Sequence, residues 1–262
     1  MALVRYGARQ IVPPDPEVVI TARPVVTTAL TIIYETDPEI IADVLPPPLE
    51  PAAEPLVRVV MSTVAINGNP SFGSGNFTVK ARHEGVDGEY CLFMPMTEEH
   101  VVVGGRETFG EPKKIADVSA VRTGDDVVGR IARKGFDLFE FRGHVVERMP
   151  VPPSNVDLEF YFKYLRSPDG NGLTDPHLVY CEYDREILSL ERVEGELLLG
   201  ESPLDPVADI VVRRVRSVTW MDRIGRQTAR IKQRVSSDSL MPYVHQKYDD
   251  IGALRAAAKT GV

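Results

Sequence analysis

The sequence predicts a mainly β (α+β) protein whose strands form a mostly antiparallel barrel or sandwich. Segments rich in β-branched and aromatic residues recur along the chain, and few segments have helical character. The regular alternation of strand and helix that is typical of a parallel sheet is absent. The 262 residues are 43% hydrophobic and 26% charged, enough for a sizeable core. We expect a single domain over residues 1–262.

The first elements follow from proline and capping patterns. Residues 1–24 are rich in proline and are predicted to form an N-terminal arm, followed by a strand at 25–34. A short helix is predicted next, capped by Thr36 or Asp37, and Thr36 and Glu39 have the spacing of a capping box. Three prolines at 46–48 are expected to end it.

Most of the remaining chain is predicted to be strand. Residues 67–75, NGNPSFGSG, are expected to be a loop because glycine, asparagine and proline dominate them. Residues 125–147 predict a hairpin that turns near Lys134 and Gly135. A C-terminal extension, residues 236–262, is expected to be partly helical. The other predicted strands are 56–66, 76–83, 89–96, 158–165, 177–183, 186–200, 209–220 and 225–235.

Bulk properties exclude several classes of function. The formal net charge of −8 disfavours binding to nucleic acid or to an anionic membrane, since both need clustered positive charge. No apolar run approaches the ~20 residues of a membrane span, and no secretory signal is evident, so we expect a cytoplasmic protein. Cys91 and Cys181 lie in apolar strands and are predicted to be buried thiols. The five histidines form no metal-binding motif, so no metal site is expected.

A pair of lysines in an apolar setting is the main chemical signal. Lys113 and Lys114 lie within GGRETFGEPKKIADV, residues 104–118. A neutral lysine amine can attack a ketone, and the resulting iminium acts as an electron sink for decarboxylation, aldol addition or dehydration. An ordinary lysine pKa near ~10.4 opposes this, but burial or a neighbouring positive charge lowers it. From the dipeptide alone, two solvated surface lysines are the commoner outcome.

The wider stretch resembles the acetoacetate decarboxylase family, whose pattern reads approximately G-R-E-x-x-x-x-P-K-K. Residues 33–51, IYETDPEIIADVLPPPLEP, resemble a second family segment, and the similarity covers roughly residues 25–235. The resemblance implies a closed antiparallel β-barrel with peripheral helices, a small keto-acid substrate, no cofactor, and a homo-oligomer, a tetramer or larger. The matching motif residues are Arg106, Glu107, Pro112, Lys113 and Lys114.

The resemblance also implies roles for individual residues. Lys113 would be the Schiff-base nucleophile, and Lys114 would lower its pKa as a neighbouring cation. Glu111, where family members usually carry an apolar residue, is a candidate acid or base, though it could equally face solvent. Tyr90 and Glu84 are weaker candidates. The candidate substrate-binding residues are Arg23, Phe93, Phe109, Arg106 and Glu107, although Glu107 could instead form a structural ion pair with Arg106 and the phenylalanines could be core residues.

Three departures from the family pattern argue for a changed reaction. Two glutamates of the decarboxylases correspond to Val60 and Val79, and an arginine on the first strand corresponds to Thr27, with Arg23 nearby. Loss of these groups with retention of the lysines favours the branch that resembles pyruvate aldolase-dehydratases, acting on a small 2-oxo acid or hydrating a 2-oxo-enoic acid. The alternatives are an acetoacetate decarboxylase that releases CO2 and acetone, with the lost groups supplied from elsewhere such as Arg23 and Glu84, and a non-enzymatic protein that binds small molecules.

Overall fold

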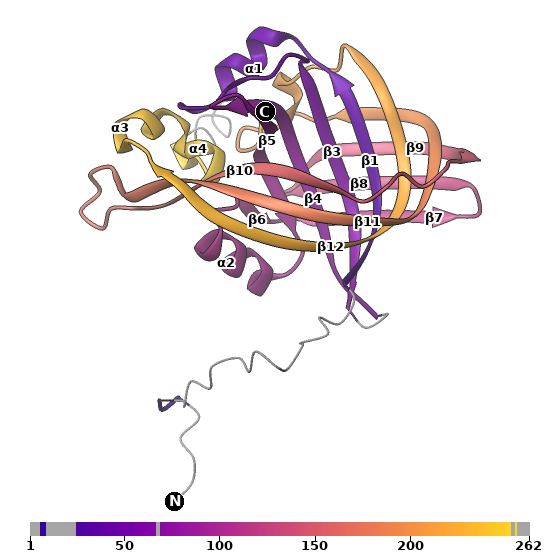
Figure 1. Ribbon diagram of the computed structural model, residues 1–262, viewed down its shortest axis with the longest axis horizontal. Helices are drawn as coiled ribbons and strands as arrows, with labels where there is room; N and C mark the ends of the chain where they lie inside the picture. The colour runs from indigo at the N-terminus through magenta and orange to yellow at the C-terminus, as the bar shows by residue number, and fades with distance from the viewer. Residues whose placement is uncertain (1–5, 9–24, 67–68, 253–254, 256–262) are drawn as a thin grey trace, which may run out of the picture.

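The computed structural model describes residues 6–8, 25–66, 69–252 and 255. In this part of the chain twelve strands belong to one sheet, and short helices pack at its periphery (Figure 1). The strands are β1 (Val25–Glu35), β2 (Glu50–Pro51), β3 (Leu56–Ile66), β4 (Asn69–His83), β5 (Val86–Met96), β6 (Lys113–Ile115), β7 (Asp117–Thr123), β8 (Asp126–Arg133), β9 (Phe136–Arg148), β10 (Asn155–Arg166), β11 (Leu173–Leu199) and β12 (Arg214–Arg234). The helices are α1 (Pro38–Val44), α2 (Glu99–Thr108), α3 (Ser237–Leu240) and α4 (Val244–Lys247), with 3-10 turns at Val207–Asp209 and Met241–Tyr243.

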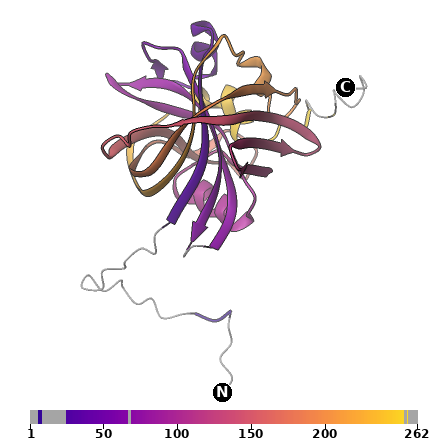
Figure 2. The same cartoon turned by 90° about the vertical axis from the view of Figure 1, so that its right-hand side faces the viewer.

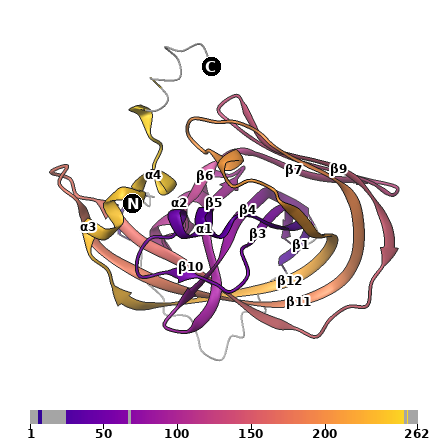
Figure 3. The same ribbon diagram turned by 90° about the horizontal axis from the view of Figure 1, so that it is seen from above.

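The sheet order explains how distant segments meet. It runs β10-β5-β4-β3-β1-β12-β11-β9-β8-β7, and β10 also pairs with β11, so the hydrogen-bonded path returns to β10. Pairing is antiparallel except where β5 meets β6 and β10. The long strands β11 and β12 curve side by side around the molecule in Figure 3. The predicted mainly β, mostly antiparallel fold is confirmed.

The two longest strands were each predicted as two separate strands. The segments predicted at 177–183 and 186–200 form one strand, β11, and those at 209–220 and 225–235 lie largely in β12. Asp184 and Arg185 fill the gap between the first two predicted segments. Arg185 instead stays in the strand, buried and paired with acidic side chains of β10.

Two local predictions are wrong, and one is confirmed. Most of the predicted loop at 67–75 belongs to β4, because its glycines allow close packing: a Cβ at Gly75 would lie 2.6 Å from Pro95 Cγ. The capping box does not form, since α1 begins after Asp37 without a side-chain cap, and the Thr36 hydroxyl has no partner among the described residues. The hairpin turn is confirmed, with positive φ at both Lys134 and Gly135.

Alternate residues of the central strands face two different environments. One face supplies the main hydrophobic core, to which β1 contributes Leu30, Ile32 and Tyr34. The other face has a smaller apolar cluster that includes Cys91 and Cys181, both buried and free as predicted. Helices α1 and α2 lie at opposite ends of the sheet in Figures 1 and 2. No described helix has the length and apolar character needed to cross a membrane.

Candidate active site

The two adjacent lysines point to opposite sides of β6. This short strand runs parallel to β5, with Lys113 beside Met94, and both lysine side chains are buried. Successive residues of a strand face opposite ways. Lys113 therefore lines a cavity of about 230 Å³, whereas Lys114 borders a separate cavity of about 200 Å³ on the other side.

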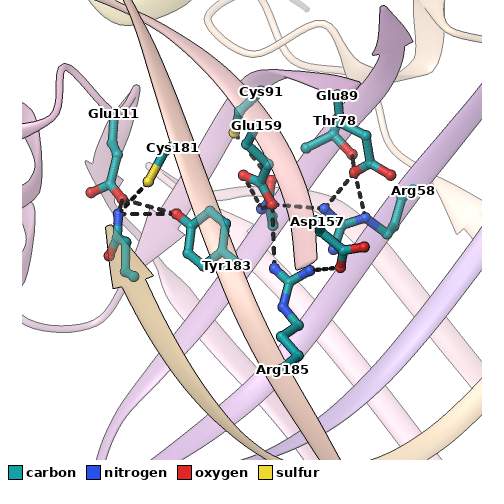
Figure 4. Close-up of polar contacts among 12 residues, drawn as sticks. Arg58, Thr78, Glu89, Cys91, Glu111, Asp157, Glu159, Cys181, Tyr183 and Arg185 are labelled. Atoms are coloured by element: carbon teal, nitrogen blue, oxygen red, sulfur yellow. Dashed lines mark hydrogen bonds and ion pairs between the residues drawn. The ribbon is translucent and has the colours of Figure 1, made fainter. Parts of the chain in front are cut away.

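A buried carboxylate holds the Lys113 ammonium. Glu111 Oε2 lies 2.7 Å from Lys113 Nζ, and the Glu111 side chain is almost fully buried. Its other oxygen accepts hydrogen bonds from Gln227 Nε2 at 2.9 Å and from the Tyr183 hydroxyl at 3.2 Å (Figure 4). Glu111 and Lys113 are two residues apart in the sequence, and their side chains both line the cavity. The sequence alone did not decide whether Glu111 faces Lys113 or solvent.

The glycines of the motif make room for this pair. Gly105, in α2, packs so closely that a Cβ there would lie 2.6 Å from Lys113 Nζ. The helix ends just before Gly110, whose φ of +84° lies in the left-handed region that favours glycine. Helix α2 was not predicted, because three β-branched valines followed by two glycines are poor helix formers.

Four of the predicted substrate-binding residues lie away from the cavity. Arg106 Nη1 donates to the carbonyl oxygens of Lys113 and Lys247, both at 2.9 Å, so it fixes the backbone of the lysine strand. Glu107 is exposed on α2 and forms no ion pair with Arg106. Phe109 caps α2, and Phe93 packs on the Lys114 side of β6. The fifth candidate, Arg23, lies outside the described residues.

The weaker candidates are also placed elsewhere. Tyr90 donates to Gln246 Oε1 at 2.6 Å, and Glu84 is exposed and paired with Lys232. Neither lines the Lys113 cavity. Among the described residues, no group of three or more His, Cys, Asp or Glu side chains is arranged to hold a metal ion.

The structure also tests the three positions that depart from the family pattern. Val60 and Thr27 line the cavity beside Lys113. Val79 does not: it faces the main core, and Asn76, on the other face of β4, lines the cavity instead. Val79 therefore cannot contribute to the cavity, because odd and even positions of β4 face opposite ways.

A network of buried charges behind the cavity was not predicted from the sequence. At its centre is Glu159 of β10, with no exposed surface. Its carboxylate accepts from Arg58 Nη2 at 2.7 Å, from Asn76 Nδ2 at 3.1 Å, and from Arg185 Nη2 at 3.4 Å (Figure 4). Burial would raise the pKa of Glu159, but the charges of Arg58 and Arg185 outweigh it and lower this pKa. Glu159 is thus held as a carboxylate.

The network extends in two directions from Glu159. Arg58 also donates to Glu89 at 2.6 Å, and burial is again outweighed by positive charge, so the pKa of Glu89 falls to about 2. Toward the cavity, the Tyr161 hydroxyl donates to Glu159 and lies 2.8 Å from the Tyr183 hydroxyl. Burial raises the pKa of both phenols, so they remain hydrogen-bond donors. Polar contacts therefore run from Glu159 through the two phenols to Glu111. Each phenol has a single proton, so the phenol–phenol contact is a hydrogen bond only when one phenol does not donate to its carboxylate.

Lys114 points away from Lys113, and its predicted role as an activating neighbour of Lys113 stays a prediction. Lys114 Nζ contacts Asp205 Oδ1 at 2.7 Å and Asp249 Oδ1 at 3.5 Å. Arg133 binds the same two carboxylates, at 2.6 Å each. Lys114 therefore belongs to a charge-balanced cluster on the far side of β6.

The C-terminal extension contacts the lysine strand β6 through Arg106. Besides accepting from Arg106, Lys247 of α4 directs its ammonium at the carbonyl oxygens of Phe162 and Tyr164, at 3.3 and 3.5 Å. It has no acidic partner within 4 Å in the described chain. Burial, followed by the charges of Arg106 and Lys163, lowers the pKa of Lys247 to about 7.

Lys247 should make stability depend on pH. Its pKa of about 7 in the folded protein is below the ordinary value of 10.5, so between these values only the unfolded chain holds the proton. The free energy of unfolding should therefore rise with pH in this window, by at most about 1.4 kcal/mol per unit. We expect Lys247→Met to be more stable than the wild type at pH 7, with a gap that shrinks toward pH 10. Denaturant unfolding at several pH values measures it, with exposed Lys134→Met as control; a constant gap would contradict it.

Fold and site together define a class of protein. A buried lysine, paired with a carboxylate and facing a cavity in a mainly β sheet, is the arrangement of a lysine Schiff-base enzyme. The chain belongs to the acetoacetate decarboxylase family, since the family model described as acetoacetate decarboxylase (ADC) matches residues 8–233. The family match ends before the C-terminal extension.

Comparisons with individual proteins agree with this assignment. The chain is 32% identical to acetoacetate decarboxylase 1 of Bradyrhizobium diazoefficiens over 202 residues, 71% of this chain and 76% of that one. The fold matches the crystal structure of acetoacetate decarboxylase from Legionella pneumophila with a TM-score of 0.71 and 20% identity, over 80% and 88% of the two chains. It also matches the enduracididine biosynthesis enzyme MppR, complexed with the condensation product of pyruvate and imidazole 4-carboxaldehyde, with a TM-score of 0.65 and 17% identity, over 79% and 87%.

Proposed function

We propose that this enzyme is a Schiff-base lyase that acts on a small 2-oxo acid such as pyruvate, as an aldolase-dehydratase or as a hydratase of a 2-oxo-enoic acid. The observation that carries the proposal is the cavity itself: Lys113 and Glu111 face it as an ion pair, while Val60 presents an apolar side chain to it. Support comes from MppR, which has this fold and was captured with a pyruvate condensation product. A closed barrel and a homo-oligomer stay predictions from the family resemblance, and a cytoplasmic location stays a prediction from the sequence.

The proposed reaction begins with proton transfer from Lys113 to Glu111. The neutral amine attacks the keto carbon, and loss of water gives an iminium. Glu111 is close enough to exchange protons with the Lys113 nitrogen. The Tyr183 hydroxyl, which contacts Glu111, is a second donor near the keto oxygen that leaves as water. Removal of a proton from the adjacent carbon gives an enamine, which adds to an aldehyde; elimination of water from that adduct and hydrolysis of the imine release the product and restore Lys113.

A second candidate is acetoacetate decarboxylation, which the names of the curated relatives favour. The same iminium would then accept the electrons of the broken carbon–carboxylate bond. The two reactions share Lys113 and differ in what is lost, CO2 or water. The cavity residues Asn76 and Gln227 are neutral, so the described lining holds one carboxylate, Glu111, as its acid–base group.

Borohydride trapping tests the proposal. The protein is incubated separately with pyruvate and with acetoacetate, reduced, and the mass of the peptide that contains Lys113 is measured, together with CO2 release. A pyruvate adduct on Lys113 without CO2 from acetoacetate is expected. An acetone-sized adduct from acetoacetate, accompanied by CO2, would establish the decarboxylase instead.

Glu111→Gln separates imine formation from later proton transfers. The amide can still accept from Gln227 and Tyr183 but cannot take a proton, so we expect turnover to fall by about 10²- to 10⁴-fold while a pyruvate adduct still accumulates after long incubation. Glu107→Gln, in the same motif but exposed on α2, is the matched control and should keep full activity. Equal activity of Glu111→Gln and the wild type would show that another group moves the proton.

A further inference from the structure

Arg223 stands out among the charged residues of the Lys113 cavity. It lies on β12, opposite Thr27 of β1 and Ile187 of β11, and lines the cavity together with Lys113. Directly opposed residues of paired strands have Cβ atoms about 4.5–5.5 Å apart. Because Thr27 is short and also lines the cavity, the longer Arg223 side chain has free space in front of it.

Arg223 is half-buried, and the buried charges around it are matched. Lys113 is paired with Glu111, and Arg185 is paired with Asp157 and Glu159. Arg58 is likewise held by Glu89 and Glu159. In the described part of the chain Arg223 has neither a hydrogen bond nor an ion pair to an acid, so its guanidinium faces the cavity without a direct acidic partner.

The surroundings of Arg223 make this charge costly without a ligand. Burial and the charges of Arg185 and Arg58 lower the pKa of Arg223 to about 9. An arriving carboxylate would relieve that electrostatic cost, because a guanidinium binds a carboxylate through two parallel hydrogen bonds. Much of the rest of the wall is apolar, formed by Phe72, Met94, Met96 and Val101.

We propose that Arg223 binds the substrate carboxylate and makes the cavity selective for keto acids with one negative charge. The inference rests on the proposed Schiff-base function and adds to it the residue that selects the substrate class. A neutral ketone leaves Arg223 without a direct acidic partner, and the second carboxylate of a dicarboxylic acid finds no further unpaired cation that is buried in the described cavity. The apolar wall then accommodates the uncharged end of the substrate or its condensation partner.

The test compares two probes on matched variants. Pyruvate and its uncharged methyl ester are trapped on Lys113 with borohydride. For each probe, the probe concentration that gives half the maximal rate of adduct formation is measured. Arg223→Met should raise this concentration for pyruvate about 10- to 100-fold and leave that for methyl pyruvate within about twofold. Arg226→Met is the control, because Arg226 is on the same strand at the cavity rim but exposed; it should change neither value.

Calorimetric titration of pyruvate separates this inference from the proposed function. Binding of the carboxylate does not require an imine, so weaker binding to Arg223→Met than to the wild type supports the role of Arg223 even if Lys113 traps neither probe. Failure of Lys113 to trap either probe would overturn only the proposed Schiff-base function. Equal affinity of both proteins for pyruvate, or no binding by either, would overturn the role of Arg223. So would a loss of binding in Arg23→Met but not in Arg223→Met.

Discussion

Lys113→Arg should reduce turnover to the background rate, a loss of roughly 10⁴-fold or more, because the variant lacks the nucleophile of a covalent route. Arginine is chosen since its guanidinium keeps a positive charge beside Glu111, which lies 2.7 Å from the native ammonium. Alanine would leave that nearly inaccessible carboxylate without its cation, so a loss of activity could then reflect unfolding. The variant should also yield no borohydride adduct with pyruvate or acetoacetate.

Two measurements make this result specific to the chemistry of Lys113. Circular dichroism and thermal unfolding should show a folded Lys113→Arg protein, and Lys232→Arg, a surface lysine paired with Glu84, should keep wild-type activity. Substantial turnover by folded Lys113→Arg would exclude an imine on this residue. A trapped adduct on a different lysine would relocate the nucleophile.

The sequence predicted the parts of the site that lie close together along the chain. Lys113, Glu111 and the flanking glycines fall within a nine-residue stretch, and their mutual contacts follow from a helix, a tight glycine turn and a short strand. The strands that carry most of the fold were also predicted, because β-branched and aromatic residues mark them. Errors concentrated at glycines and charged residues, where close packing and burial override local preference.

The residues contributed by distant strands were not predicted. Glu159, Arg58 and Arg185 come from β10, β3 and β11, and they meet only through the pairing register of a long, curved sheet. In the sequence each looks like an ordinary surface charge. Arg223 is similar: its position opposite Thr27 depends on the register between β12 and β1. A signal existed in β10, where Glu159 directly precedes three aromatic residues and begins the buried run of the strand.

Lys114→Met should destabilise the protein strongly without changing the chemistry at Lys113. The substitution removes one cation from a buried cluster of two cations and two carboxylates, Lys114, Arg133, Asp205 and Asp249, leaving one negative charge uncompensated. Loss of one partner of a buried ion pair costs about 3–5 kcal/mol. For a chain of this size the melting temperature should fall by roughly 6–20 °C.

The same variant decides between two roles for the second lysine of the motif. If Lys114 activated Lys113 as a neighbouring cation, its removal would move the pH midpoint of imine trapping upward. The opposite orientation of the two side chains predicts an unchanged midpoint, measured at a temperature where the variant is folded. A double variant, Lys114→Met with Asp205→Asn, restores the charge balance around Arg133 and Asp249 and should recover part of the lost stability. A normal melting temperature together with a shifted midpoint would reverse the assignment, making Lys114 an activating residue and not a structural one.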